Sequence, residues 1–395
     1  MPIFVPMKFP NKLKNKINLR KEQKAFRSLG VATKLVDFSS NDYLSFAKSE
    51  AIFDATHQFL VDENIKINGA TGSRLLSGNH FLYDDVEKQI AKFYQSEAAL
   101  IFNSGYDANV GFFSSIPQRG DVILYDEFIH ASIRDGIQLS NAKSYKFKHN
   151  DIEDLGSLLK RHSERVSEYH NEIYVVTESV FSMDGDTPDL VTMSQISNKY
   201  SAHFIVDEAH AIGVFGEYGC GEVQRLGVEN DVFARIVTFG KALGCHGAAI
   251  LGSQELINYL VNFARSFVYT TGLSPHALAT IKMAYNQLFT MNDSEESQQQ
   301  KLQENIRFFK SEVVRLELQN IFIESNSAIH CCVVSGNEKA KKIANQLSEK
   351  GFAVKAILSP TVLEGEERLR FCLHSYNSTK EITDVLENLS MFVNK

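Results

Sequence analysis

The sequence predicts an α/β protein whose central sheet is largely parallel. Between about residues 98 and 251, six short apolar runs alternate with helical or turn-rich segments, the pattern of a sheet covered by helices. The runs at 204–206 and 236–237 are wholly apolar, which is typical of parallel strands buried on both faces. Several runs end in polar residues and a glycine-bearing turn, and such sheets bind ligands beyond the carboxyl ends of their strands.

The elements follow in order from a mixed, basic stretch at residues 1–37, which we expect to be an arm. A glycine-spaced loop at 68–78 either lines a site or is a plain surface loop. A helix is expected over 82–93, because its apolar residues recur on one face. The strands expected in the large sheet are 98–102, 122–125, 173–176, 204–206, 236–239 and 248–251.

The pattern of expected helices and strands changes after about residue 300. A polar helix is expected over 301–315, with strands at 328–334, 352–357 and 368–373 and helices at 340–350 and 379–392. A chain of 395 residues is also too long for a single hydrophobic core. We therefore expect an N-terminal arm (1–45), a large domain with the mostly parallel sheet between helices (46–290) and a smaller α/β C-terminal domain (291–395).

Composition excludes several classes of function. A net charge of −7 provides no field for gathering nucleic acid or anionic lipid, and the basic segment 8–27 is interpreted as a solvated arm or helix. No apolar run approaches the roughly 20 residues that a membrane-spanning helix needs, and the proline-interrupted opening does not have the pattern of a signal peptide. The five cysteines are scattered without metal-ligand spacing, so we expect reduced thiols in a cytoplasmic protein and no metal site.

An aspartate and a lysine stand at the ends of two consecutive expected strands. Asp207 follows the run 204–206, and Lys241 follows the next strand, 34 residues later (241 − 207). Pyridoxal 5'-phosphate (PLP) needs a lysine amine to hold its aldehyde and a carboxylate facing its ring nitrogen. For such a pair taken alone, an ordinary strand-end aspartate and a solvated lysine remain the alternative.

Three further segments carry polar groups at strand ends. Residues 103–109 join a strand to a helix, and the helix start either binds a phosphate or is an ordinary turn. His130 either stacks on a planar cofactor ring or is a half-buried structural histidine. The segment 178–186 packs carboxylates and hydroxyls among apolar residues, which favours a functional loop over a surface loop.

Two other pairs have equally open alternatives. Thr270 and Thr271 supply hydroxyls suited to a phosphate, but threonine is also common in strands. Arg368 and Arg370 alternate with apolar residues. They either bind a substrate carboxylate or form the solvated face of a strand.

Taken together, the chain resembles the α-oxoamine synthase family of fold-type I PLP-dependent enzymes. The segments that carry this resemblance span most of the chain: FSSNDYL (38–44), GATGSRLLSGNH (69–80), FNSGYDANVG (102–111), YDEFIHASIRDG (125–136), TESVFSMDGD (177–186), VDEAHAIGVFGEYGCG (206–221), TFGKALG (238–244) and ARSFVYTTGLSP (264–275). Within the family, the nearest resemblance is to the branch that makes 8-amino-7-oxononanoate in biotin synthesis.

The resemblance implies a role for each matching position. Lys241 would bind the PLP aldehyde, Asp207 would pair with the ring nitrogen and His210 would contact the ring hydroxyl. His130 would stack on the ring. The other residues expected to hold the cofactor are Gly105, Tyr106, Glu178, Ser182 and Thr238.

The resemblance also implies partners. Thr270 and Thr271 would reach the phosphate of the neighbouring subunit's cofactor, so a homodimer with active sites at the subunit interface is expected. Arg27, Thr361 and Arg370 would face the substrates, which would be an acyl-CoA and a small amino acid.

Two positions depart from the pattern of the oxononanoate branch. Leu358 stands where that branch typically has arginine, so a cation expected near the substrate is missing and a pimeloyl-type donor is less strongly indicated. His246 follows the lysine turn where a small residue is usual.

The activity expected is the decarboxylating condensation of a small amino acid, most simply L-alanine, with an acyl-CoA. Glycine or serine as the amino acid, amino transfer by the same cofactor, and a non-enzymatic scaffold are the alternatives. Scaffold relatives usually lack the lysine, whereas Lys241 is present here.

Overall fold

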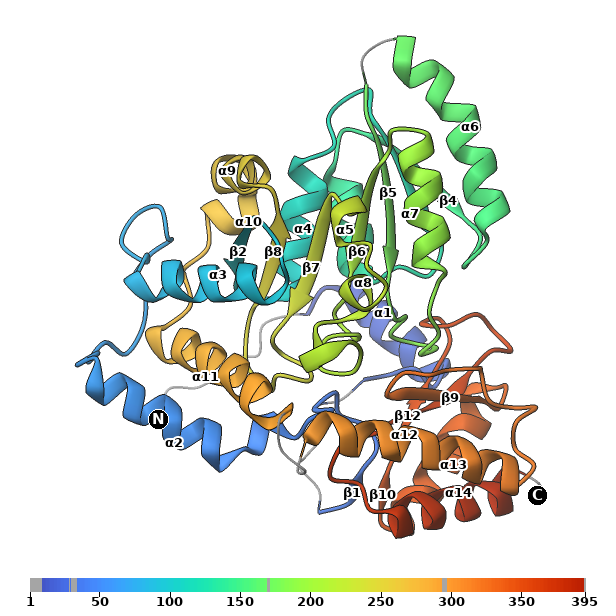
Figure 1. Cartoon of the computed structure of the whole chain (residues 1–395). Coiled ribbons are helices and arrows are strands. Elements are labelled where there is room, and N and C mark those ends of the chain that lie inside the picture. The colour runs from blue at the N-terminus through green and yellow to red at the C-terminus, as the bar shows by residue number, and fades with distance from the viewer. Residues whose placement is uncertain (1–8, 28, 30–33, 169–170, 293–296, 394–395) are drawn as a thin grey trace.

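The computed structural model describes residues 9–27, 29, 34–168, 171–292 and 297–393. Its centre is a seven-stranded sheet in the order β2-β8-β7-β6-β5-β3-β4 (Figure 1). Only β8 runs antiparallel to its neighbours, which confirms the largely parallel sheet expected from the sequence. The strands are β2 (Ala98–Phe102), β3 (Val122–Asp126), β4 (Lys143–Phe147), β5 (Ile173–Glu178), β6 (His203–Asp207), β7 (Ala234–Thr238) and β8 (Ala248–Gly252).

Helices cover both faces of this sheet (Figure 1). Along β6, Ile205 packs toward the first helical layer, whereas Phe204 and Val206 pack toward the second, because successive side chains point to opposite faces. Both faces are buried, which explains the continuous apolar runs. The first layer holds α4 (Gly105–Ser115), α5 (Ala131–Leu139), α9 (Gln254–Phe263) and α10 (Arg265–Val268), and the second holds α6 (Ile152–Glu168), α7 (Leu190–Lys199) and α8 (Glu222–Arg225).

A third cluster of buried side chains joins the sheet to the C-terminal part of the chain. It includes residues of α2 (Glu50–Asp62), α3 (Phe81–Phe93), α11 (Pro275–Asn292) and α12 (Gln298–Arg315). The C-terminal part contains a three-stranded antiparallel sheet in the order β11-β12-β9. The strands of this sheet are β9 (Ile329–Val333), β11 (Lys355–Ile357) and β12 (Arg368–Cys372), and the other elements of this part are β10 (Phe352–Ala353), α13 (Asn337–Glu349) and α14 (Thr379–Val393).

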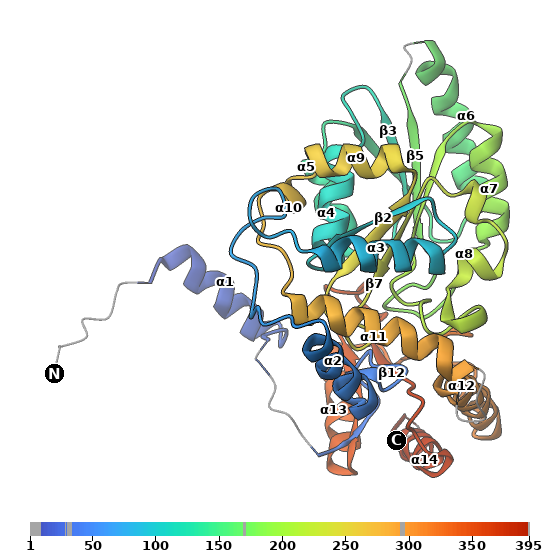
Figure 2. The same ribbon diagram turned by 60° about the vertical axis from the view of Figure 1, so that its left-hand side comes forward.

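The N-terminal segment is tied to this smaller part rather than to the large sheet. Strand β1 (Val36–Asp37) pairs in parallel with β10. Helix α1 (Asn11–Glu22) has no buried residue and projects from the side of the molecule (Figure 2). Residues 1–8, 28 and 30–33 of the expected arm lie outside the described residues. We keep the division at 45 and 290 as a proposal.

Four local expectations were wrong or incomplete. Strand β4 was not predicted, because its sequence KSYKF is polar, as befits the edge of a sheet. The expected strand 352–357 is divided between β10 and β11. Thr270 and Thr271 lie outside any strand, and both arginines of β12 are buried, so the solvated-face interpretation fails.

Within the described ranges, no helix combines the length and apolar character needed to cross a bilayer.

Candidate active site

The carboxyl ends of β6 and β7 place Asp207 and Lys241 at one cavity. Because β6 and β7 pair in parallel, both strands end at the same edge of the sheet. The cavity at this edge has a volume of about 180 Å³. Seven residues singled out from the sequence line it: Gly105, Tyr106, His130, Glu178, Asp207, Thr238 and Lys241.

Lys241 begins a chain of hydrogen bonds that leads away from this cavity. Its Nζ lies 2.6 Å from Nε2 of His210, whose Nδ1 lies 2.7 Å from the hydroxyl of Tyr43. Burial lowers the pKa of Lys241 to about 8, although Asp207 and Glu178 partly oppose this shift. Burial, with the charge of Lys241 second, also lowers the pKa of His210 well below its usual value. Near neutral pH, the amine is therefore neutral and nucleophilic far more often than in an ordinary lysine.

The carboxylate of Asp207 is held by two hydrogen bonds. Asn109 on α4 donates from Nδ2 to Oδ2 over 2.9 Å, and the backbone N–H of Ala209 donates to Oδ1 over 2.9 Å. The same Asn109 amide reaches the hydroxyl of Ser132, which lies 2.7 Å from Nδ1 of His130. These contacts fix the orientation of the carboxylate before any ligand binds.

Glu178 is a buried carboxyl beside this network. It ends β5 opposite Asp207 in the paired register, and its Oε1 has no hydrogen-bond partner among the described residues. Burial, with the neighbouring Asp207 charge second, raises the pKa of Glu178 well above its usual value. The neutral acid is therefore favoured there, and an unpaired buried oxygen of this kind calls for a polar ligand.

The remaining wall of the cavity is suited to a phosphate. Helix α4 begins at Gly105, and Gly105 and Tyr106 line the cavity together with the hydroxyl-bearing Thr238. Backbone N–H groups at a helix start attract anions. A phosphate cradle, an amine, a fixed carboxylate and the unpaired Glu178 oxygen thus meet in one cavity, and the residues present fit PLP.

The structure leaves other predicted residues outside this cavity. Asn103 Nδ2 donates to the hydroxyl of Thr270 over 3.1 Å and to the carbonyl of Thr271 over 2.6 Å, near the start of α4. The backbone carbonyl of Ser182 accepts from Nε of Arg370 over 2.7 Å. These contacts place the threonines beside β2 and Ser182 beside the C-terminal sheet.

Arg27 and Thr361, two of the predicted substrate residues, contact each other outside the cavity. Arg27 Nη2 donates to the hydroxyl of Thr361 over 3.4 Å. Of the two departures, Leu358 packs at the edge of the large apolar cluster, and His246 is exposed and does not line the cavity.

Several contributors were missed in the sequence. Asn109 and Ser132 line the cavity, and Tyr43 contacts His210. Asn109 could have been found, because it lies four residues after Gly105 and therefore on the same face of α4. No local pattern indicates the distant contact between Tyr43 and His210.

A histidine clamp positions the loops around the site. His149 Nδ1 lies 2.9 Å from Asp126 at the end of β3, and its Nε2 lies 2.7 Å from Asp186 in the loop after β5. Phe128 stacks on its ring at 4.4 Å. Burial alone would lower the pKa of His149, but the hydrogen bonds and charges of both aspartates outweigh burial and raise the pKa to about 9. The imidazolium therefore joins the loop that carries His130 to the loop that carries Ser182.

Replacing His149 with glutamine is expected to lower the free energy of unfolding by about 2 kcal/mol near pH 6, the scale of hydrogen bonds to a charged group. A histidine whose pKa rises from 6.5 to about 9 on folding stabilises fully below pH 6.5 and loses this contribution as the pH rises through 9. Urea unfolding of the wild type and of His149→Gln should show that the difference in their free energies of unfolding decreases as the pH rises through 9. His203→Gln, which removes one contact to Glu172, is the control; equal losses in the two variants would contradict the clamp.

Comparison with known proteins decides the family. The model of the aminotransferase class I and II family matches residues 33–389. The chain belongs to this family. An 8-amino-7-oxononanoate synthase from Emericella nidulans is 39% identical over 372 residues, which cover 91% of this chain and 90% of that protein. Within the family, the chain is an α-oxoamine synthase, a PLP-dependent enzyme that transfers acyl groups.

Solved structures share the fold. A serine palmitoyltransferase from S. paucimobilis, with bound PLP and myriocin, has a TM-score of 0.85 and 25% identity, with 97% of each chain covered. The 8-amino-7-oxononanoate synthase of Francisella tularensis has a TM-score of 0.75 and 28% identity, with 91% of this chain and 98% of that chain covered. The fold-type I transferase architecture expected from the sequence is confirmed.

Proposed function

We propose that this α-oxoamine synthase condenses L-alanine with an acyl-CoA thioester and releases CoA and CO2. The observation that carries the proposal is the 39% identity, over nine-tenths of both chains, to a protein named 8-amino-7-oxononanoate synthase. In the product of that name, the terminal methyl group and the amine-bearing carbon are what alanine leaves after losing its carboxyl group. The remaining carbons correspond to a dicarboxylic acyl donor.

Bonds and atoms balance in this reaction. A carbon–carbon bond forms between the α-carbon of the amino acid and the acyl carbonyl, and the thioester carbon–sulfur bond breaks to release CoA as a thiol. The bond to the amino acid's carboxyl group breaks to release CO2, and a proton returns to the α-carbon. When bound, PLP supplies the electron sink for the charge that develops at this carbon.

The residues of the chain perform the other tasks. Lys241 would hold the cofactor and, as a neutral amine, would accept the α-proton at Nζ. Asp207, fixed by Asn109 and the Ala209 backbone, would hold a proton on the ring nitrogen. His130 would lie against the ring, and the start of α4 with Thr238 would bind the phosphate. His210, 2.6 Å from Lys241, would keep the amine within reach of the cofactor aldehyde and the α-proton.

Arg370 is the proposed partner of the amino acid's carboxylate. It is buried, and its contacts to Ser182 and to Asn41 (3.0 Å) hold the guanidinium in place. Arg27 and Thr361 would face the acyl donor. Because Leu358 supplies no cation, we leave the acyl chain open.

We also propose a homodimer in the cytoplasm. Thr270 is half-buried and Thr271 is exposed on this single chain, and both lie close to the start of α4, which suits contact with a second subunit's cofactor. All five cysteines are free, as in a reducing compartment. Thiol titration of the denatured protein should count five.

The function is tested with purified holoenzyme, a panel of alanine, serine and glycine, and acyl-CoAs of different lengths. The expected result is release of free thiol and CO2 in equal amounts, with alanine giving the highest kcat/KM. Faster turnover with serine would instead indicate the reaction of the serine palmitoyltransferases that share the fold. Absence of thiol release with every pair would refute acyl transfer.

Amino transfer is the second candidate, because the matching family model is described by that activity. An aminotransferase converts its cofactor to pyridoxamine phosphate with the amino donor alone. We expect no such conversion when the holoenzyme is incubated with L-alanine and the cofactor is analysed by chromatography. Stoichiometric conversion would replace the condensation proposal.

A further inference from the structure

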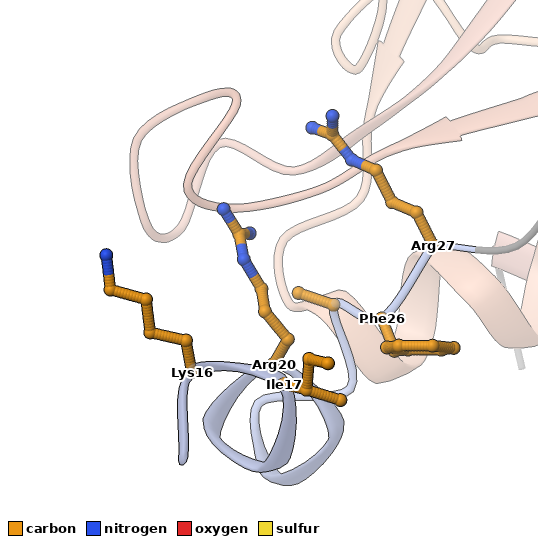
Figure 3. Close-up of a pocket in the computed structure, with 6 residues that line it drawn as sticks. Lys16, Ile17, Arg20, Phe26 and Arg27 are labelled. Carbon is orange, nitrogen blue, oxygen red and sulfur yellow. The ribbon is translucent and has the colours of Figure 1, made fainter. Parts of the chain in front are cut away.

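A second cavity lies between α1 and the segment that follows it. Its volume is about 310 Å³, and it is lined by Lys16, Ile17, Arg20, Ala25, Phe26 and Arg27. Figure 3 shows the charged ends of Lys16, Arg20 and Arg27 pointing to the same side of the backbone. None of these residues lines the PLP cavity.

The three cations of this cavity lack carboxylate partners. Among the described residues, Lys16 and Arg20 form no ion pair, and Arg27 contacts only the neutral hydroxyl of Thr361. Lys16 and Arg20 are also four residues apart on one helix, a spacing at which like charges repel. A bound anion would relieve this repulsion.

The surrounding surface is basic although the whole chain has a net charge of −7. Residues 11–27 hold seven cationic side chains and one carboxylate, Glu22. Helix α13 lies against the end of this segment, because Lys24 pairs with Glu338 and Lys341 donates to the carbonyl of Lys24. Three lysines of α13 add to the positive potential: Lys339, Lys341 and Lys342. Such a patch attracts a ligand that carries several negative charges.

The cavity also offers an apolar surface beside its cations. Ala25 is buried, whereas the ring of Phe26 is 52% exposed and Ile17 is 37% exposed. An exposed aromatic ring next to arginine and lysine suits a ligand that joins a flat ring to phosphates. Inorganic phosphate alone would leave the apolar surface uncovered.

We propose that this cavity binds the nucleoside phosphate end of CoA, with the phosphates on Lys16, Arg20 and Arg27 and the adenine against Phe26. The inference rests on the proposed function, in which acyl-CoA is the donor. Arg27 connects this cavity with the proposed donor site, because it lines the cavity and also contacts Thr361. Arg27 and Thr361 are the two residues expected to face the acyl donor. The nucleotide would anchor the donor at α1.

Calorimetry of the holoenzyme with CoA and with adenosine 3',5'-bisphosphate tests the site without turnover. The double variant Lys16→Gln/Arg20→Gln is expected to raise both dissociation constants by roughly tenfold, the effect of losing two exposed charge contacts to phosphate. Added KCl should weaken binding to the wild type more than to the variant. Lys14→Gln is the matched control, because Lys14 lies on the opposite side of α1 from Lys16 and does not line the cavity.

Kinetics supply a second readout that general damage to the fold would not reproduce. The double variant should raise KM for an acyl-CoA by roughly tenfold, whereas KM for the same acyl group on pantetheine, which lacks the nucleotide, should stay near the wild-type value. Equal effects on the two donors, or the same loss in Lys14→Gln, would overturn the proposal. Nucleotide binding without thiol release would refute the condensation but support the nucleotide site. Thiol release with an unchanged KM for acyl-CoA in the double variant would support the condensation but refute the nucleotide site.

Discussion

Replacing Lys241 with alanine is expected to lower kcat for thiol release by at least about 10³-fold, because it would remove the residue proposed both to hold the cofactor and to move the α-proton. The expected effect is large because no second amine lines the cavity among the described residues. Free thiol is measured with a chromogenic reagent after mixing enzyme, L-alanine and acyl-CoA. Borohydride reduction followed by peptide mass spectrometry should place PLP on the peptide that contains Lys241 in the wild type and on no peptide of the variant.

The matched control for this variant is Lys282→Ala. Lys282 forms an ion pair with Asp85 at 2.7 Å, away from the cavity. We expect unchanged kcat and unchanged labelling of Lys241 in that control. Wild-type turnover by Lys241→Ala, or labelling of another lysine, would contradict the assignment of the cavity as the PLP site.

The same variant tests the proposed dimer when it is mixed with Thr270→Ala/Thr271→Ala. If the threonines serve the partner's cofactor, a hybrid dimer contains one complete site, with Lys241 from one subunit and both threonines from the other. The threonine variant alone is expected to have little activity, because it would lack the proposed contacts to the cofactor phosphate. Activity should then return after the two variants are unfolded together and refolded. If the threonines serve their own subunit, the mixture stays inactive, and the interface assignment fails.

The sequence predicted the large sheet well because its strands are buried on both faces. Strand β5 and strand β6 are apolar runs that end in charged residues, so their type and position can be read from composition alone. Strand β4 carries lysines because it lies at the edge, and an exposed edge strand leaves no hydrophobic pattern. Helix α1 has the same limitation, because a helix without buried residues leaves no apolar face, so the segment 8–27 could be interpreted only as an arm or a helix.

The site was predictable to the extent that its residues follow strands. Asp207 and Lys241 stand at ends of adjacent parallel strands, and parallel pairing brings such positions to one edge. Residues that approach from helices or distant loops could not be predicted, because their contacts depend on how whole elements pack. Asn109 and Tyr43 are of this kind, and so is the pairing of His149 with two loops.

Replacing Arg235 with methionine is expected to lower the free energy of unfolding by about 3–5 kcal/mol, the cost of leaving a buried charge without its partner. Arg235 on β7 and Glu208, which directly follows Asp207, are both buried. Arg235 donates from Nε to Glu208 over 2.8 Å and from Nη2 to the same oxygen, and it also donates to the carbonyl of Cys220 over 2.9 Å. Urea unfolding at a fixed PLP concentration measures the loss.

A double-mutant cycle separates the ion pair from the space that the arginine fills. Glu208→Gln removes the carboxylate charge, so the double variant with Arg235→Met should lose less stability than the sum of the two single losses. Lys88→Met is the control, because Lys88 pairs with Asp84 at 2.6 Å and both side chains are largely exposed, so a much smaller loss is expected. Similar losses at Arg235 and Lys88 would show that burial does not increase the stabilisation from the Arg235–Glu208 pair. A larger loss at Arg235 would show that the buried contact between β7 and Glu208, the residue after Asp207, stabilises the fold.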